Sequence, residues 1–306
     1  MRVPGWLKGL YYLAILPVLV GVLFPFAVML STALKSPQEI SGYGQAHYSL
    51  IPQHWQLSNF IECFRAMPLG QCFLNSLIVA TGATLLNILC ALPAAYALSR
   101  LEFWGKKALL FGILVTQMFA PIVLVLALFA QFQNYHLLQT DDGLVNAFKW
   151  IHVFPSGWVA EALEGWKVFL ALILVNAACS LAFSIWLLTG YFSTVPEEIE
   201  EAALIDGCSR LQTIRRVILP LALPGLVTTV IFAFIGAWNE YVFALTFVPS
   251  DELRTLTVAI PSFIGQYETQ WHYLMAAALL ATIPVMALFL SVEKHLVRGL
   301  TAGGIK

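Results

Sequence analysis

Long apolar segments alternate with short polar ones along the whole chain. Because about 20 apolar residues are needed to cross roughly 30 Å of hydrocarbon, six of these segments can each form a membrane-spanning helix. They are Leu10–Ala33, Phe73–Leu98, Ala108–Phe132, Val168–Tyr191, Leu219–Phe247 and Tyr273–Val292. The pattern therefore predicts an all-α integral membrane protein with six transmembrane helices.

The first apolar segment has two interpretations. Arg2 and Lys8 precede it, and Ser31-Thr32-Ala33 resembles the cleavage site of a signal peptide. Its apolar run is much longer than the 7–15 residues of a signal peptide, which favours a retained span.

Composition agrees with a membrane location. The chain of 306 residues is 59% hydrophobic and 11% charged, whereas soluble domains are about 25% charged. A net charge of -1 favours neither nucleic acid nor a strongly acidic ligand. The five cysteines are an odd number and predict no disulfide framework; Cys63 and Cys72 could pair if their loop faces an oxidising compartment.

Positive residues in the loops predict the orientation. If the sides of the membrane are assigned by alternation, the side of the N-terminus holds eleven lysines and arginines: Arg2, Lys8, Arg100, Lys106, Lys107, Arg210, Arg215, Arg216, Lys294, Arg298 and Lys306. The other side holds five: Lys35, Arg65, Lys149, Lys167 and Arg254. The positive-inside rule then places both termini in the cytoplasm.

Much of the charge collects between spans four and five, in EEIEEAALIDGCSRLQTIRRVILP (residues 197–220), which we call the acidic loop. Thr194 and Glu197 fit a capping box that opens a first short helix, and Gly207 is typical of a helix end. On that helix Ile199, Ala202, Ala203 and Asp206 recur at helical spacing and form a small, mildly apolar face. Ser209 and Gln212 fit a second capping box, which opens a second short helix.

A loop of this kind could lie on the lipid surface or dock into another protein. Its four neighbouring glutamates would be repelled by anionic inner-leaflet lipid, which favours docking.

The acidic loop closely resembles the EAA loop of ATP-binding-cassette (ABC) importer permeases. The matching positions are Glu201-Ala202-Ala203, Asp206-Gly207 and Leu219-Pro220, with Cys208 where the family usually has a smaller residue. The stretches IWLLTGYFSTVPEEIEEAA, WNEYVFALTF, RTLTVAIPSF and LVRGLTAGGIK are similar to the carbohydrate branch, which includes the maltose importer. The resemblance covers roughly Asn75 to Lys306.

This resemblance implies a type I ABC importer permease of a bacterial inner membrane that carries a sugar. In the family the first helix of the loop is a coupling helix that sits in a cleft of a separate ATPase subunit. Five residues are expected to carry the coupling: Glu201, Ala202, Ala203, Asp206 and Gly207. The expected partners are two ATPase subunits, a second permease subunit and an extracytoplasmic solute-binding protein.

The chain lacks the sequence of an ATPase. No G-x-x-x-x-G-K-S/T phosphate loop occurs in it, nor any metal motif of the H-E-x-x-H or C-x-x-C kind. We therefore expect no enzyme activity and no cofactor here, with ATP and magnesium bound by the partner subunit. Alternatives are the same machine importing glycerol phosphate or another polyol, and an ion-coupled secondary carrier, which would have no reason to carry an EAA loop.

Polar residues within the spans are candidates for the translocation path, because they are costly there unless they are used. The candidates are Asn239, Glu240, Asn75 and Asn176. A buried Asn–Glu pair bonded to a neighbouring helix is the alternative for Asn239 and Glu240. Asn176, Ser180 and Ser184 form one stripe of span four, and such stripes more often join helices than bind solutes.

The domain plan has three parts. Residues 1–72 hold the first span and an outer loop, residues 73–296 the five-helix core, and residues 297–306 a cytoplasmic tail. The core includes the acidic loop and an outer insert, 141–167, which could be an interfacial helical hairpin or a contact for a partner. Pro93, Pro121 and Pro284 are expected to kink spans two, three and six.

Overall fold

The computed structural model describes residues 5–41, 49–118, 121–134, 156–248 and 250–303. These residues are mainly helical, and the one extended pairing among them is an isolated bridge between Ile264 and Thr269. The chain divides into two units, Met1–Gly70 with Ala259–Pro284 and Gln71–Val258 with Val285–Lys306.

Four helices are much longer than the other elements of the described residues. They are α1 (Gly5–Ala33), α4 (Leu69–Arg100), α8 (Ser156–Ser193) and α15 (Trp271–Gly303). The shorter elements before α8 are α2 (Pro37–Ser41), α3 (Asn59–Ala66), α5 (Lys106–Thr116) and α6 (Pro121–Asn134). After α8 follow α9 (Glu197–Ile205), α10 (Arg210–Thr213), the π-helix η1 (Ile214–Ile218), α11 (Leu219–Leu221), α12 (Leu223–Trp238), α13 (Val242–Phe247), η2 (Asp251–Leu253), α14 (Leu256–Ala259) and η3 (Ile260–Phe263).

The described residues contain four helices that are long and apolar enough to cross a membrane. These segments are Leu13–Ala33, Leu69–Arg100, Trp166–Ser193 and Trp271–Ser291. They correspond to predicted spans one, two, four and six. A fifth crossing is possible if the bent pair Arg210–Leu221 and Leu223–Trp238 counts as one span.

Predicted span three is not one continuous helix. Helix α5 ends at Thr116, and α6 begins at Pro121. Proline has no N–H to donate to the preceding turn, and its ring clashes with a carbonyl there. Pro121 therefore starts a new helix instead of kinking one, whereas Pro93 and Pro284 lie inside α4 and α15.

Predicted span five is also broken. The axes on the two sides of Ala222 differ by 82°, and Pro220 and Pro224 flank this bend. Each proline removes one backbone donor, which weakens the helix on both sides of Ala222. A second break at Asn239–Tyr241 separates α12 from α13.

The first unit is held by polar contacts at the end of α1. The side-chain amide of Asn59 in α3 donates to the carbonyl oxygens of Ala33 and Lys35, at 2.9 Å each. The hydroxyl of Tyr273 in α15 donates to Glu62 of α3 at 2.9 Å. The span of α1 has a mean hydropathy of 2.7, and its side chains from Leu13 to Leu30 are largely exposed, whereas Thr32 and Ala33 at its end are buried.

The cysteines that could have paired are both free. Cys63 and Cys72 are buried thiols, and burial raises the pKa of the Cys63 thiol. Of the predicted outer insert, the part from Ser156 onward is the beginning of α8, and residues 135–155 lie outside the described ones.

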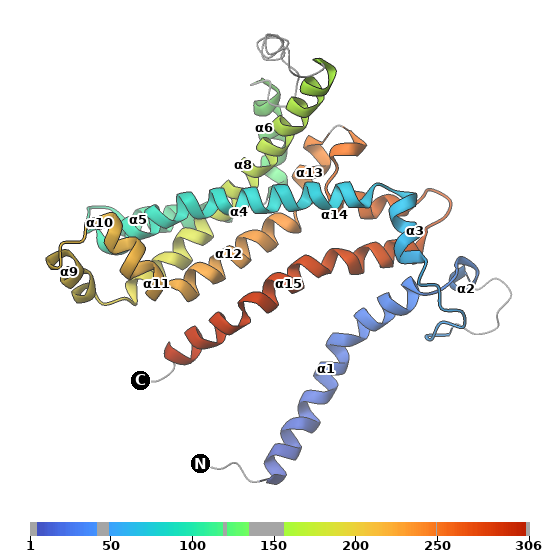
Figure 1. Ribbon diagram of the computed structural model, residues 1–306, viewed down its shortest axis with the longest axis horizontal. Coiled ribbons are helices and arrows are strands. Elements are labelled where there is room, and N and C mark those ends of the chain that lie inside the picture. Colours follow the sequence, from blue (N-terminus) through green and yellow to red (C-terminus); the bar gives the residue numbers. More distant parts are fainter. Residues whose placement is uncertain (1–4, 42–48, 119–120, 135–155, 249, 304–306) are drawn as a thin grey trace. The chain divides into compact units, whose positions relative to one another are not determined.

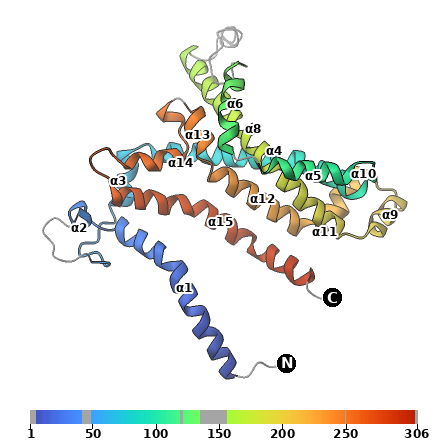
Figure 2. The same cartoon turned by 180° about the vertical axis from the view of Figure 1, so that it is seen from behind.

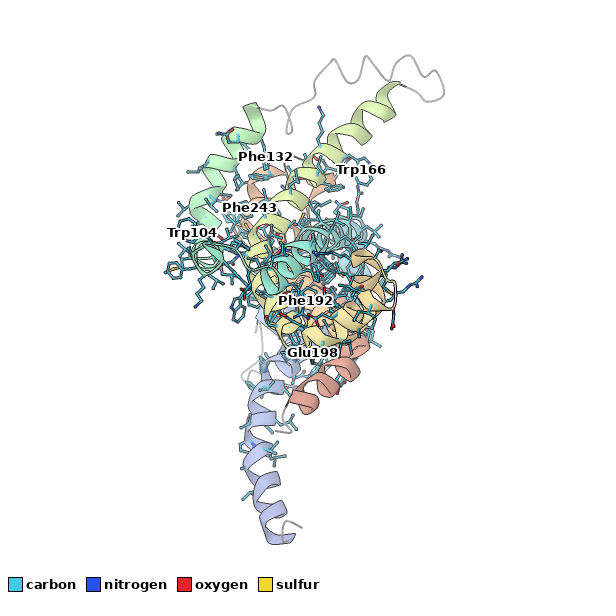
Figure 3. All side chains as sticks on the ribbon, turned by 90° about the vertical axis from the view of Figure 1, so that its left-hand side faces the viewer. Trp104, Phe132, Trp166, Phe192, Glu198 and Phe243 are labelled. Atoms are coloured by element: carbon cyan, nitrogen blue, oxygen red, sulfur yellow. The ribbon has the colours of Figure 1, made fainter. Side chains whose placement is uncertain are left out.

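The second unit has two apolar clusters along α4 and α8. One lies near their C-terminal ends, where Leu98 of α4, Leu188 and Phe192 of α8 and Ile218 of η1 are buried together. The other includes Leu172 of α8 and Phe243 and Phe247 of α13, and the ring of Phe132 of α6 packs edge-on against Phe247 (Figure 3 labels Phe132 and Phe243). The acidic loop therefore starts and ends at a packed end of the unit.

Close approach of α12 to α8 depends on Gly225. A Cβ atom at this position would lie 2.2 Å from Cγ of the Tyr191 ring, far inside van der Waals contact. A Cβ atom added at Gly236 of the same helix would have no other atom within 4 Å.

We expect Gly225→Ala to lower the stability of the chain by about 1–3 kcal/mol, the usual cost of overpacking. The matched variant Gly236→Ala should be neutral or slightly stabilising, because alanine is the better helix former. The thermal midpoint of the purified protein in detergent measures both. Equal midpoints for the two variants would contradict the close approach.

Candidate functional site

The acidic loop lies at one end of the second unit. Figures 1 and 2 show α9 and α10 beyond the ends of α4 and α8, on the side of the unit where α5 begins. The chain leaves α8 at Ser193 and returns to a long helix at Leu223.

The start of α9 differs from the prediction. Its N-cap is Pro196, and no side chain caps this end. The hydroxyl of Thr194 instead donates to the carbonyl of Tyr191 at 2.7 Å. The predicted capping box of Thr194 and Glu197 is therefore wrong, because α9 begins at Glu197 itself and Thr194 lies two residues before the N-cap.

The end of α9 is as predicted. Gly207 has a φ of 88°, which a residue with a side chain rarely adopts. Its N–H donates to Leu204 at 3.1 Å, and the N–H of Cys208 donates to Ala203 at 3.1 Å. This pair of bonds is a Schellman motif, which closes the last turn of the helix.

The second predicted capping box is confirmed. The Ser209 hydroxyl accepts from the N–H of Gln212 at 3.4 Å, and the Gln212 side chain accepts from the N–H of Ser209 at 2.9 Å. The two short helices are thus joined by four residues whose backbone donors are largely satisfied within the loop.

The five residues expected to carry coupling do not share one face. Glu201, Ala202, Asp206 and Gly207 are exposed, whereas Ala203 is buried within this chain. The predicted small face of α9 therefore needs correction, since Ala203 packs inward. Figure 3 is seen from this end of the unit and shows Glu198 on α9.

Two apolar side chains of the loop were missed as candidates. Ile205 at the end of α9 is 85% exposed, and Leu211 at the start of α10 is 76% exposed. Apolar side chains this exposed outside the spans are typical of a protein contact when they gather in one place. A leucine or isoleucine gives no sign in the sequence of which way it points.

The inward side of α9 is held by Arg100, the last residue of α4. Its Nε lies 2.8 Å from Oε2 of Glu200, its Nη2 donates to the carbonyl of Val195 at 2.9 Å, and its Nη1 is 3.7 Å from Glu197. The hydroxyl of Tyr96, one turn earlier, donates to the other oxygen of Glu200. The Arg100 and Glu200 side chains are only 9% and 13% exposed, so this ion pair is largely shielded from water.

Asn75 and Asn176, two of the path candidates, are engaged within the chain. The amide of Asn75 donates to the carbonyls of Glu252 and Arg254, at 2.9 and 3.0 Å. The amide of Asn176 donates to Leu172 one turn earlier in α8 at 2.9 Å. From the same stripe Ser180 accepts from Asn87 of α4 at 2.8 Å, which joins the two helices.

Asn239 and Glu240 lie at the break between α12 and α13. Both carboxylate oxygens of Glu240 accept backbone N–H groups, from Phe243 at 2.7 Å and from Ala244 at 3.0 Å. Glu240 thus caps α13, and Thr257 donates to its backbone carbonyl at 2.7 Å. Asn239 is exposed at the end of α12.

The described residues contain no group of three or more potential ligands that could hold a metal ion. The acidic loop offers contact chemistry: exposed carboxylates, exposed apolar side chains, of which Ile205 and Leu211 are the most exposed, and a base held by Arg100.

Comparison with known proteins places this arrangement in a family. Residues 87–302 match the binding-protein-dependent transport system inner membrane component family. The chain belongs to this family. The matched region includes the whole acidic loop.

Two relatives support the assignment of this permease to the family, and one solved structure has its fold. It is 33% identical to the inner membrane ABC transporter permease protein YcjP of Escherichia coli, over 97% of this chain and 95% of YcjP. It is 37% identical to the trehalose/maltose transport system permease protein MalG of Thermococcus litoralis, over 76% of this chain and 74% of MalG. The resemblance to carbohydrate importer permeases is thereby confirmed.

The fold is that of a chain in the crystal structure of a bacterial ABC transporter involved in the import of the acidic polysaccharide alginate. The TM-score is 0.72 at 20% identity, over 94% of this permease and 96% of that chain.

The end of α9 in this permease can be tested through Gly207. Gly207→Ala places a side chain at a positive φ, which costs about 1–2 kcal/mol, so the last turn of α9 should open more often. Hydrogen–deuterium exchange at Cys208, whose N–H closes this turn, should become faster. Gly190→Ala in α8 has open space around its Cβ and is the control. Unchanged exchange in the Gly207 variant would contradict the Schellman end.

Proposed function

We propose that this chain forms half of the translocation path of a binding-protein-dependent ABC importer and couples that path to ATP hydrolysis on a separate subunit. The observation that carries the proposal is a family match that includes the acidic loop, together with a loop whose outer residues are exposed and whose base is anchored.

The acidic loop is the proposed contact for the ATPase subunit, with α9 as the coupling helix. Glu201, Ala202, Asp206 and Gly207 remain the proposed coupling residues, and Ile205 joins them because of its exposure. Ala203 is proposed to act from the inside, as a small residue that lets α9 lie close to its own chain. A charge-assisted contact from Glu201 and an apolar contact from Ile205 fit the mixed chemistry of protein interfaces.

Partners follow from what the chain lacks. It carries no phosphate loop, so ATP and magnesium are proposed to bind to two copies of a partner ATPase. A second permease subunit would complete the path, and an extracytoplasmic binding protein would deliver the solute. The apolar surface of α1 from Leu13 to Ala27 is exposed and is available to lipid or to the second permease.

The topology proposed for this machine has six crossings with both termini in the cytoplasm. α5 and α6 together supply the third crossing, and the bent segment from Arg210 to Trp238 enters the fifth. This assignment keeps the acidic loop on the side with eleven of the sixteen positive residues.

The proposed solute is a sugar. The trehalose/maltose permease among its relatives favours a sugar over glycerol phosphate or another polyol. An ion-coupled carrier is disfavoured by membership in a binding-protein-dependent family. Among the path candidates, Asn239 is the one proposed to face the path, since the amides of Asn75 and Asn176 and the carboxylate of Glu240 are bonded within the chain.

Glu201→Lys tests the coupling contact. It reverses a charge on the outer side of α9, so the ATPase subunit encoded with this chain should no longer co-purify with it, and uptake should be lost. Glu102→Lys reverses an exposed charge near the same end of the unit but outside the acidic loop, and should retain the ATPase. Normal co-purification and uptake with Glu201→Lys would remove the coupling proposal.

A further inference from the structure

Helix α9 of the acidic loop has an inner side that contacts its own chain and an outer side that is exposed. On its inner side Glu200 and Ala203 face the chain, and on its outer side Glu198, Glu201, Ala202 and Ile205 are exposed. Of the residues of α9, Ala203 alone is buried. Apolar packing therefore holds this helix weakly, and polar contacts must supply much of its attachment.

Arg100 supplies polar contacts that attach α9 to the end of α4. Its guanidinium reaches both the helix, through Glu200 and Glu197, and the segment before the helix, through the Val195 carbonyl. Three contacts from one planar group fix both the orientation of α9 and its distance from the end of α4. A lysine has no planar group and could not fix the orientation in this way. The hydroxyl of Tyr96 holds the second oxygen of Glu200, so the carboxylate is oriented from two sides.

The base of this attachment is rigid. Arg100 ends a helix of 32 residues, where a positive charge also interacts favourably with the helix dipole. The ring of Tyr96 packs edge-on against Phe192 of α8, with centroids 6.4 Å apart. Phe192 belongs to the buried cluster that joins the ends of α4 and α8. Arg100 is thus held on the end of α4, which packs against the end of α8.

Burial makes the ion pair hard to break. Loss of one partner would leave the other charge in a site with little water, which is strongly unfavourable. A force on the outer side of α9 will therefore displace α4 before it separates Glu200 from Arg100.

We propose that Arg100 is the positioning residue that makes α9 and the end of α4 move as one body, so that displacement of α9 by the ATPase subunit reaches the membrane through α4. The role in transport rests on the proposed function, whereas the attachment itself does not. Tyr96 and Glu200 complete this device, which we call the Arg100 clamp.

Spin labels on the two elements test the clamp directly. With the native cysteines replaced by serine, labels at Glu198→Cys on α9 and Leu101→Cys beyond α4 should give one narrow distance distribution in the purified complex. That distribution should be the same without nucleotide and with a non-hydrolysable ATP analogue. In Arg100→Gln it should broaden, and it should shift when the analogue binds.

Rescue by a second charge reversal distinguishes a positioning role of Arg100 from a general loss of stability. The double variant Arg100→Glu with Glu200→Arg restores opposite charges and should narrow the distribution again, whereas each single reversal should not. Arg215→Gln, which removes an exposed arginine of η1, is the control and should leave the distribution unchanged. If Arg100→Gln does not accumulate in membranes, Glu200→Gln, which keeps the shape of the side chain, takes its place.

Transport gives the functional result, with radiolabelled maltose as the probe and ATP hydrolysis measured in parallel. Maltose uptake per ATP hydrolysed should fall about tenfold in Arg100→Gln, within the range of coupling between linked sites, while the ATPase subunit still co-purifies. An unchanged distribution or an unchanged ratio would overturn the clamp. If the wild-type chain does not bind an ATPase, the proposed function fails. The distance distribution measured without nucleotide then still shows whether Arg100 attaches α9 to the end of α4.

Discussion

A charge that is removed from water must find an opposite charge or a set of hydrogen bonds, and the acidic loop is built on one such pair. Glu200 is one of four neighbouring glutamates, and Arg100 and Tyr96 neutralise and orient it on the inner side of α9. Glu198 and Glu201 are left exposed, and Glu197, also exposed, keeps only a longer contact of 3.7 Å to Arg100. The ion pair thus divides a run of similar residues into an anchor and a contact surface.

Local signals in the sequence predicted the end of α9 and the start of α10, although the capping box predicted for the start of α9 was wrong. Gly207 ends α9 because only glycine adopts its φ cheaply, and Ser209 starts α10 because its hydroxyl reaches an N–H three residues on. The positions of α1, α4, α8 and α15 followed from apolar length alone. These features depend on residues only a few positions apart.

Other features depend on residues that are distant in the chain. Glu200 pairs with Arg100, a hundred positions away, and the sequence pattern does not indicate which arginine it meets. The breaks at Pro121 and between Pro220 and Pro224 were not predicted, because apolar composition continues through them and a proline inside a span can either kink a helix or end it.

Polar groups of the described spans mostly stabilise the permease itself. Asn75, Asn87 and Asn176 bind carbonyls within the chain, and Glu240 caps α13. Such bonds satisfy groups that would otherwise be costly in hydrocarbon. Solute recognition would then rest largely on the proposed partner subunits, which agrees with a chain whose main polar feature is the acidic loop.

The central claim is that α9 binds a separate ATPase subunit. The most direct measurement is cross-linking from a cysteine at Ile205, 85% exposed at the end of α9, to the ATPase subunit in native membranes with a short thiol reagent. The account predicts a specific cross-linked product whose yield changes with ATP, and none from a cysteine at Tyr267, far along the chain and 96% exposed. Equal products from both positions, or none from Ile205 while uptake continues, would contradict it.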